Sequence, residues 1–311
     1  MRNPTLKLRA ARASIATAGG LALIKLVTGL LTGSMAVLAS AVDSLLDILM
    51  SGVNYLAIRQ ADQPADQSHP FGHGKFETLA TLIQSMVITI SGAWIIFESI
   101  RRLIHGAELT RIGGGIGVLL FSTVASWLIA GYLRKTAKAT DSSALQADSL
   151  HFAMDVYTNL ALLAGLIVIY FIHIPWLDAA LSVLVGLYVL YEAVKLIRHG
   201  LRDVLDVELP ESFRRRIADL IEAQGDDLIG FHNLRTRRAG SQKIMDFHLT
   251  VCKHLTVDEA HAIADQLEQR IESEIPGSDV TIHIEPCQRP DCPGRDKCHP
   301  LLSPYPRESR P

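Results

Sequence analysis

Long apolar runs separated by short polar turns fill the first two thirds of the chain. Six of these runs are close to the roughly 20 residues that a helix needs to cross a bilayer. They span residues 13–32, 36–58, 78–100, 112–133, 145–172 and 176–197. The pattern predicts a bundle of six transmembrane helices, and an even number of spans places both termini on one side of the lipid bilayer.

Beyond residue 205 the pattern becomes that of a small soluble domain. Helical spacing of apolar residues over 211–224 is followed by two strand-like segments, 229–240 and 243–252, which meet at a Gly-Ser turn. An amphipathic helix over 256–275, with Thr256 and Glu259 as a capping box, precedes a last strand at 279–287. The order α-β-β-α-β predicts an α+β, metallochaperone-like fold. We therefore expect a membrane domain at 1–205, an α+β domain at 206–288 and a Cys- and Pro-containing flexible tail at 289–311.

The charge pattern predicts the orientation of the chain in the membrane and gives no support for nucleic acid as a partner. The formal net charge of −2 gives no reason to expect nucleic acid binding. Lys25 interrupts the first apolar run, which argues against a cleaved signal peptide. Basic residues gather on the face that carries the termini, although Arg101 and Arg102 lie on the other face. Both termini are therefore predicted to be cytoplasmic.

Two of the predicted spans carry ionisable residues in pairs. Asp43 and Asp47 stand four residues apart in the second span, as do His151 and Asp155 in the fifth. Residues at this spacing leave the same face of a helix, and ionisable groups inside a membrane usually have a function. Three carboxylates and an imidazole suit tetrahedral Zn²⁺, while a polar seam or water-filled cavity without metal is the alternative. Asp148 is interpreted as a solvated charge, or as one on the approach to the site.

Two further groups of histidines lie in the polar parts of the chain. Asp66, His69 and His73 occupy a Gly- and Pro-containing loop after the second span, where a metal site and an ordinary polar loop are both open interpretations. In the C-terminal domain each predicted strand carries one histidine, and Glu285 follows on the last strand. A further histidine lies on the intervening helix, so the candidate set is His232, His248, His261, His283 and Glu285.

Three motifs resemble the cation diffusion facilitator family, most closely its bacterial zinc and iron efflux branch. They are "VDSLLDI", "PADQSHPFGHGKFETLA" and "ADSLHFAMDVYTN", and the resemblance covers about residues 8–288. It implies a homodimer in the bacterial cytoplasmic (inner) membrane. Asp43, Asp47, His151 and Asp155 would form a zinc-type transport site, and Asp66, His69 and His73 a loop site. His232, His248 and His283 would hold a binuclear cytoplasmic site, with His261 beside it and Glu285 where close relatives usually have Asp. Lys75 and Asp206 would interlock the two domains.

The function predicted from these features is efflux of Zn²⁺ from the cytoplasm in exchange for protons, with Zn²⁺ also bound structurally. Cd²⁺ would fit the same ligands, and Fe²⁺ or Mn²⁺ are the alternatives within the family. An intramembrane metalloenzyme and a membrane-anchored metal sensor are alternatives of other classes. Cys287, Cys292, Cys298 and His299 could bind zinc, although their spacing is wider than that of a typical structural site.

Overall fold

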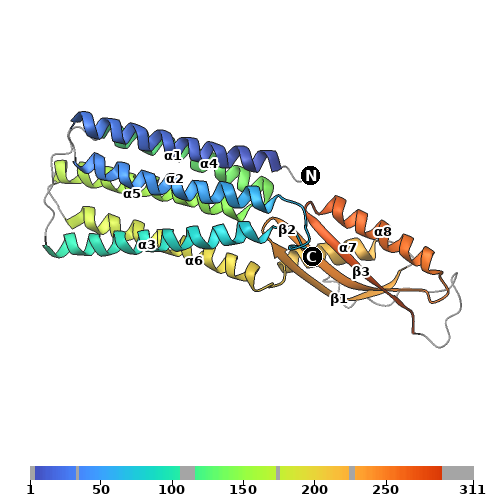
Figure 1. Ribbon diagram of the computed structural model, residues 1–311. Helices are drawn as coiled ribbons and strands as arrows, with labels where there is room; N and C mark the ends of the chain where they lie inside the picture. The colour runs from blue at the N-terminus through green and yellow to red at the C-terminus, as the bar shows by residue number, and fades with distance from the viewer. Residues whose placement is uncertain (1–3, 33–34, 106–115, 173–175, 224–227, 289–311) are drawn as a thin grey trace. The chain divides into compact units, whose positions relative to one another are not determined.

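The computed structural model describes residues 4–32, 35–105, 116–172, 176–223 and 228–288 (Figure 1). The chain divides into two compact units, one made of residues 3–202 and the other mainly of residues 203–311. The proline-rich tail from residue 289, with Cys292, Cys298 and His299, lies outside the described residues.

Six long helices form the first unit and lie side by side (Figure 1). Among the residues that the structure describes in full, five helices, α1, α2, α3, α4 and α6, are long and apolar enough to cross a membrane by length and composition. These findings confirm the predicted transmembrane helical bundle, while a sixth span formed by α5 stays a prediction. The helices are α1 (Pro4–Thr32), α2 (Met35–Ala61), α3 (Lys75–His105), α4 (Ile116–Thr140), α5 (Ser143–Ile172) and α6 (Trp176–Val204).

Small side chains let these helices approach one another closely. A buried cluster rich in alanine joins α1, α4 and α5, and includes Ala10, Ala130 and Ala144. At the contact between α3 and α6, a Cβ atom added to Gly186 would lie 2.6 Å from Ile96 Cγ1. Close packing of this kind replaces the hydrophobic driving force that is missing between helices in lipid.

A buried group of three charges joins α1 to the α2 and α3 region. Lys7 Nζ donates to Glu77 Oε1 at 2.8 Å and to Asp62 Oδ1 at 3.2 Å. Glu77 is fully buried, and only 4% of the Lys7 surface is exposed. Lys7 is therefore the shared cationic partner of Asp62 and Glu77. The sequence pattern does not predict this contact.

The second unit confirms the predicted α-β-β-α-β order. Strand β1 pairs with β2 antiparallel and β2 pairs with β3 parallel. Thr256 caps α8, with its Oγ1 accepting from the Glu259 N–H and its own N–H donating to the Glu259 carboxylate. The elements are α7 (Glu211–Glu222), β1 (Leu228–Ala239), β2 (Gln242–Val251), α8 (Val257–Glu274) and β3 (Ser278–Pro286).

The core of this unit lies between the sheet and the two helices. Burial alternates along β2, so that Met245, Phe247 and Leu249 join the core with Ile217 of α7 and Leu267 of α8. Because neighbouring residues of a strand point to opposite faces, the intervening residues of β2 lie on the face that the core does not use.

Candidate metal centres

Side chains from α2 and α5 form the first candidate centre. His151 Nε2 lies 2.9 Å from Asp47 Oδ1, and one ligand atom each of Asp47, His151 and Asp155 lies within 4.8 Å of the others. Tetrahedral Zn²⁺, with bonds of about 2.0–2.2 Å, needs ligand atoms about 3.3–3.5 Å apart. Small adjustments of these three groups to that spacing would therefore supply three of the four ligands of a tetrahedral ion.

Asp43, the fourth residue predicted for this centre, is placed differently. It lies one helical turn before Asp47 on α2 but is exposed and is not among the three gathered groups. Four residues advance a helix by about 400°, so the two side chains diverge by about 40°. A rotation of α2 or a bound water would supply the fourth ligand.

The loop between α2 and α3 forms the second candidate centre. Asp66 Oδ1 lies 3.3 Å from His69 Nδ1, and Asp66 Oδ2 lies 3.4 Å from His73 Nε2. The structure therefore brings all three predicted residues together, with ring centroids of the two histidines 4.4 Å apart. His73 is buried, while Asp66 and His69 are exposed.

Hydrogen bonds orient two of these candidate ligands, His73 and Asp66. His73 Nδ1 lies 3.1 Å from the Pro64 carbonyl oxygen, which can only accept, so Nδ1 carries a proton and Nε2, which faces Asp66, is the nitrogen that a metal would use. The Asp66 carboxylate accepts from the N–H groups of Ser68 and His69. Backbone donation from His69, helped by Ser68, lowers the pKa of Asp66 to about 2. Asp66 is therefore a permanently ionised ligand above about pH 3.

Replacing Asp66 by Asn tests the loop centre, because the amide oxygen still accepts from the backbone while the charge is lost. We expect the variant to lose one bound Zn²⁺ per protomer by equilibrium dialysis, whereas Gln67→Ala keeps it. The pKa of Asp66 in the folded protein lies below its ordinary value of 3.8. The Asp66 carboxylate therefore contributes its full stabilisation of the fold above pH 3.8, and this contribution is lost as the pH falls through about 2. Binding lost between pH 7 and 4 would therefore not come from protonation of Asp66. Full metal content in Asp66→Asn would contradict this assignment.

The third candidate centre is a row of histidines across the sheet of the second unit. His232 on β1 pairs in register with His248 on β2, which pairs with His283 on β3. Adjacent ring centroids are 5.1 and 4.8 Å apart. The row lies on the sheet face opposite the core, because His248 alternates with the buried residues of β2.

Glu285 holds the row together. Its Oε1 lies 2.7 Å from His248 Nδ1 and its Oε2 lies 3.3 Å from His232 Nε2, while His283 Nε2 is 3.9 Å from Oε1. His232, His248 and Glu285 have ligand atoms close enough to share one ion. His261 is exposed on α8, where it lies 3.6 Å from Asp265, and is not among the gathered groups. Its role stays a prediction.

His248 is the central member of the row, so its replacement separates the other ligands. We expect His248→Ala to lose at least one Zn²⁺ per protomer and most of the rise in melting temperature that Zn²⁺ gives the full-length protein, because metal binding to the native state is folding free energy. His254→Ala, an exposed histidine outside the row, is the matched control. A Zn²⁺-induced shift equal to that of the unmodified protein would rule out the row as a metal centre.

The structure does not test the predicted interlock between the two domains. Lys75 belongs to the first unit and Asp206 to the second, so their pairing stays a prediction. Asp206 has a positive φ of 52° and lies 3.5 Å from Arg237 Nη1 within its own unit.

One of the two interpretations of Asp148 is wrong, while the other, a charge on the approach to the metal site, stays a prediction. Asp148 is not solvated but fully buried, where its Oδ1 accepts from Gln84 Nε2 at 3.4 Å. Gln84 in turn accepts from Asn54 Nδ2. Burial follows from packing on α3 and α2, which apolar spacing along α5 alone does not reveal.

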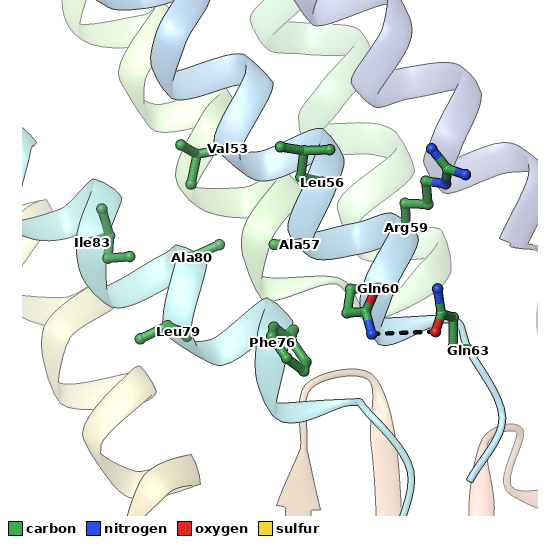
Figure 2. Close-up of a pocket in the computed structure, with 10 residues that line it drawn as sticks. All are labelled: Val53, Leu56, Ala57, Arg59, Gln60, Gln63, Phe76, Leu79, Ala80 and Ile83. Carbon is green, nitrogen blue, oxygen red and sulfur yellow. Dashed lines mark hydrogen bonds between the residues drawn. The ribbon is translucent and has the colours of Figure 1, made fainter. Parts of the chain in front are cut away.

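A groove of about 470 Å³ opens between α2 and α3, and its lining residue Phe76 stacks on His73 of the loop centre with ring centroids 6.0 Å apart (Figure 2). Its walls are mainly apolar, with Phe76, Leu79 and Ile83 from α3, and its rim carries Arg59, Gln60 and Gln63. None of the candidate metal ligands is among its ten lining residues. The groove therefore adds no further candidate ligand to these centres.

Comparisons with known proteins agree with this division into units. The family model described as the cation efflux transmembrane domain matches residues 11–205, and that of the cation efflux protein cytoplasmic domain matches residues 209–287. The chain is 38% identical over 284 residues to the cation-efflux pump FieF of Salmonella paratyphi A and of Salmonella agona, covering 90% of this chain and 92% of each relative. A solved structure of the zinc form of the putative zinc transporter CzrB is 37% identical, covers 27% of this chain and 97% of its own, and has a TM-score of 0.26.

Proposed function

This chain belongs to the cation diffusion facilitator family, and on that premise we propose that it exports Zn²⁺ from the cytoplasm in exchange for protons. It is a cation efflux transporter with a transmembrane domain, and its relatives are transporters and not enzymes. The metalloenzyme alternative is therefore set aside. The identity of the cation and of the exchanged ion is the part that we propose.

The contact between His151 and Asp47 is the observation that carries the proposal. At 2.9 Å, one proton lies between His151 Nε2 and Asp47 Oδ1. Both atoms would have to turn their lone pairs to a metal ion, and a metal ligand must be deprotonated. The proton and the cation therefore compete for the same place in the membrane domain.

This competition couples the two ions in opposite directions. Cation binding from the cytoplasm releases the proton from the His151–Asp47 pair, and a proton arriving from the other side weakens the metal shell. Asp155, within 4.8 Å of both groups, would supply the second negative charge that a divalent cation needs. Alternating exposure of α2 and α5 to the two sides of the membrane would complete the exchange.

The donor set favours zinc among the divalent cations. One imidazole nitrogen and two or three carboxylate oxygens suit the tetrahedral geometry of Zn²⁺, and Cd²⁺ would accept the same ligands. Fe²⁺ and Mn²⁺ prefer more oxygen ligands and a higher coordination number. They remain the second candidates, since the similar protein FieF is a cation-efflux pump whose name specifies no metal.

The remaining parts of the proposal concern assembly and location. We infer a homodimer in the bacterial inner membrane, with six spans and both termini cytoplasmic. The matched cytoplasmic domain supports dimerisation, and basic residues near the termini support the orientation. The loop centre and the histidine row would then bind cytoplasmic Zn²⁺ structurally.

Transport into vesicles tests both the cation and the exchange. Purified full-length protein is placed in liposomes with a zinc-sensitive dye inside, and Zn²⁺ is added outside while the interior is more acidic. We expect Zn²⁺ uptake to increase with the pH difference and to cease when a proton ionophore removes it. Uptake that is independent of the pH gradient would contradict antiport, and faster uptake of Fe²⁺ or Mn²⁺ in competition would overturn the choice of zinc.

A further inference from the structure

Five polar side chains are fully buried together inside the membrane unit, apart from the three candidate centres. Ser14 Oγ donates to Ser51 Oγ at 2.9 Å, Asn54 Nδ2 donates to Gln84 Oε1, and Gln84 Nε2 donates to Asp148 Oδ1 at 3.4 Å. They come from four helices, α1, α2, α3 and α5. All five have 0% of their surface exposed.

Two oxygen atoms of this cluster have no hydrogen-bond partner among the described residues. They are Asn54 Oδ1 and Asp148 Oδ2, and both are buried. Ser14, Asn54 and Gln84 lie around the Asp148 carboxylate, and His151 of the first candidate centre is near enough to act on its charge. Buried acceptors are rarely left unsatisfied, and an exception usually marks an unseen water or ion. With the Asp148 carboxylate ionised, both orphan atoms are acceptors, so the missing group is a hydrogen-bond donor or a cation.

The cluster lies to one side of the His151 centre along two helices. Asp148 precedes His151 by three residues on α5, and Asn54 follows Asp47 by seven residues on α2. At 1.5 Å per residue these offsets are about 5 and 10 Å, and they run toward the N-terminus of α5 and the C-terminus of α2. With both termini cytoplasmic, this is the cytoplasmic direction.

We propose that Asp148 and Asn54 form a second cation-binding position, where the divalent cation is held by oxygen ligands on its way from the cytoplasm to His151. This inference rests on the proposed function, since it needs a cation that travels through the membrane unit. A carboxylate inside a membrane is expensive without such a role. Carboxylate, amide and hydroxyl oxygens hold a partly hydrated divalent cation, whereas the imidazole of the next centre binds Zn²⁺ more tightly. The cation therefore moves toward the stronger site.

Asp148→Asn separates this role from a structural one. The new amide keeps an oxygen that accepts from Gln84 and gains an N–H that can donate to Asn54 Oδ1, so the cluster stays satisfied. A structural role predicts unchanged transport and an unchanged or higher melting temperature. Our proposal predicts that the initial rate of Zn²⁺ uptake at low Zn²⁺ falls at least 10-fold in proteoliposomes. Equilibrium binding of Zn²⁺ to the purified full-length protein would change less than twofold at the His151 centre.

Moving the carboxylate from position 148 to position 54 should rescue transport. The double variant Asn54→Asp/Asp148→Asn returns a carboxylate to the cluster from the opposite helix, and should restore at least a third of the original rate. If Asp148→Asn does not fold, Asn54→Ser, which removes the amide oxygen, should show the same loss of rate at unchanged equilibrium binding.

The outcomes distinguish this inference from the proposed function. Full uptake in Asp148→Asn, or equal losses of rate and of equilibrium affinity, would overturn the second position. If either outcome overturns the second position while Asp47→Asn is inactive in the same assay, the proposed function still stands. Normal transport by Asp47→Asn would remove the proposed function and this inference with it.

Discussion

Asp47→Asn is expected to reduce Zn²⁺ transport by at least about 100-fold. Asp47 lies 2.9 Å from His151 Nε2 and belongs to the only group of three ligands gathered in the described part of the membrane helices. Loss of an indirect partner of a metal ligand already costs about 10–100-fold in affinity or activity, so a direct ligand should cost more. The amide is nearly the same size as the carboxylate, which leaves helix packing intact.

Two control variants test whether this loss of transport is specific to Asp47. Glu192→Gln alters an α6 carboxylate that pairs with Lys195 at the surface, and we expect transport close to that of the unmodified protein. Asp43→Asn should reduce transport less than Asp47→Asn, because Asp43 is exposed and stands outside the gathered group. Zn²⁺ uptake is measured as an initial rate at equal amounts of reconstituted protein. Near-normal uptake by Asp47→Asn would show that the cluster does not carry the cation.

Lys7→Met is expected to lower the free energy of unfolding by about 3–5 kcal/mol, the usual cost of removing one partner of a buried ion pair. Glu77 has no exposed surface, and Lys7 Nζ at 2.8 Å is its close cationic partner. Without Lys7, the Glu77 carboxylate would stay charged without compensation or take up a proton, and either change costs free energy. Methionine keeps most of the length of lysine, so the effect reports the charge and not a cavity.

A double variant checks that interpretation. Lys7→Met/Glu77→Gln removes both charges, and we expect it to recover at least half of the lost stability, measured as the melting temperature of the full-length protein in detergent. Arg12→Met on the same helix, whose guanidinium lies over the Tyr55 ring at 5.9 Å, should cost less, since a cation–π contact contributes about 0.5–2 kcal/mol. A loss in the double variant as large as in Lys7→Met would mean that the charges are not what stabilises this contact.

The sequence predicts the helical bundle and the α-β-β-α-β order because both follow from local patterns. Runs of about 20 apolar residues and strand alternation are read directly along the chain. The spacing of His151 and Asp155 likewise identified one face of α5. Spacing does not reveal how a helix is rotated against its neighbours, which is why Asp43 was expected among the gathered ligands and lies outside them.

Contacts between residues distant in sequence were beyond the reach of such patterns. Lys7 and Glu77 are 70 residues apart, and nothing in either segment indicates that they meet. The burial of Asp148 depends in the same way on Gln84 and Asn54, which other helices supply. The histidine row was foreseen only as one histidine on each strand, because its alignment depends on strand register.

That register has a consequence for the order in which the protein matures. His232 and His248 lie on strands joined by a tight turn, but His283 and Glu285 follow 35 or more residues after His248, beyond α8. During synthesis the ribosome therefore releases two ligands long before the carboxylate that contacts both of them. Zinc bound by the row, as proposed, would require that β3 has paired with β2, and its presence would mark a completely folded domain.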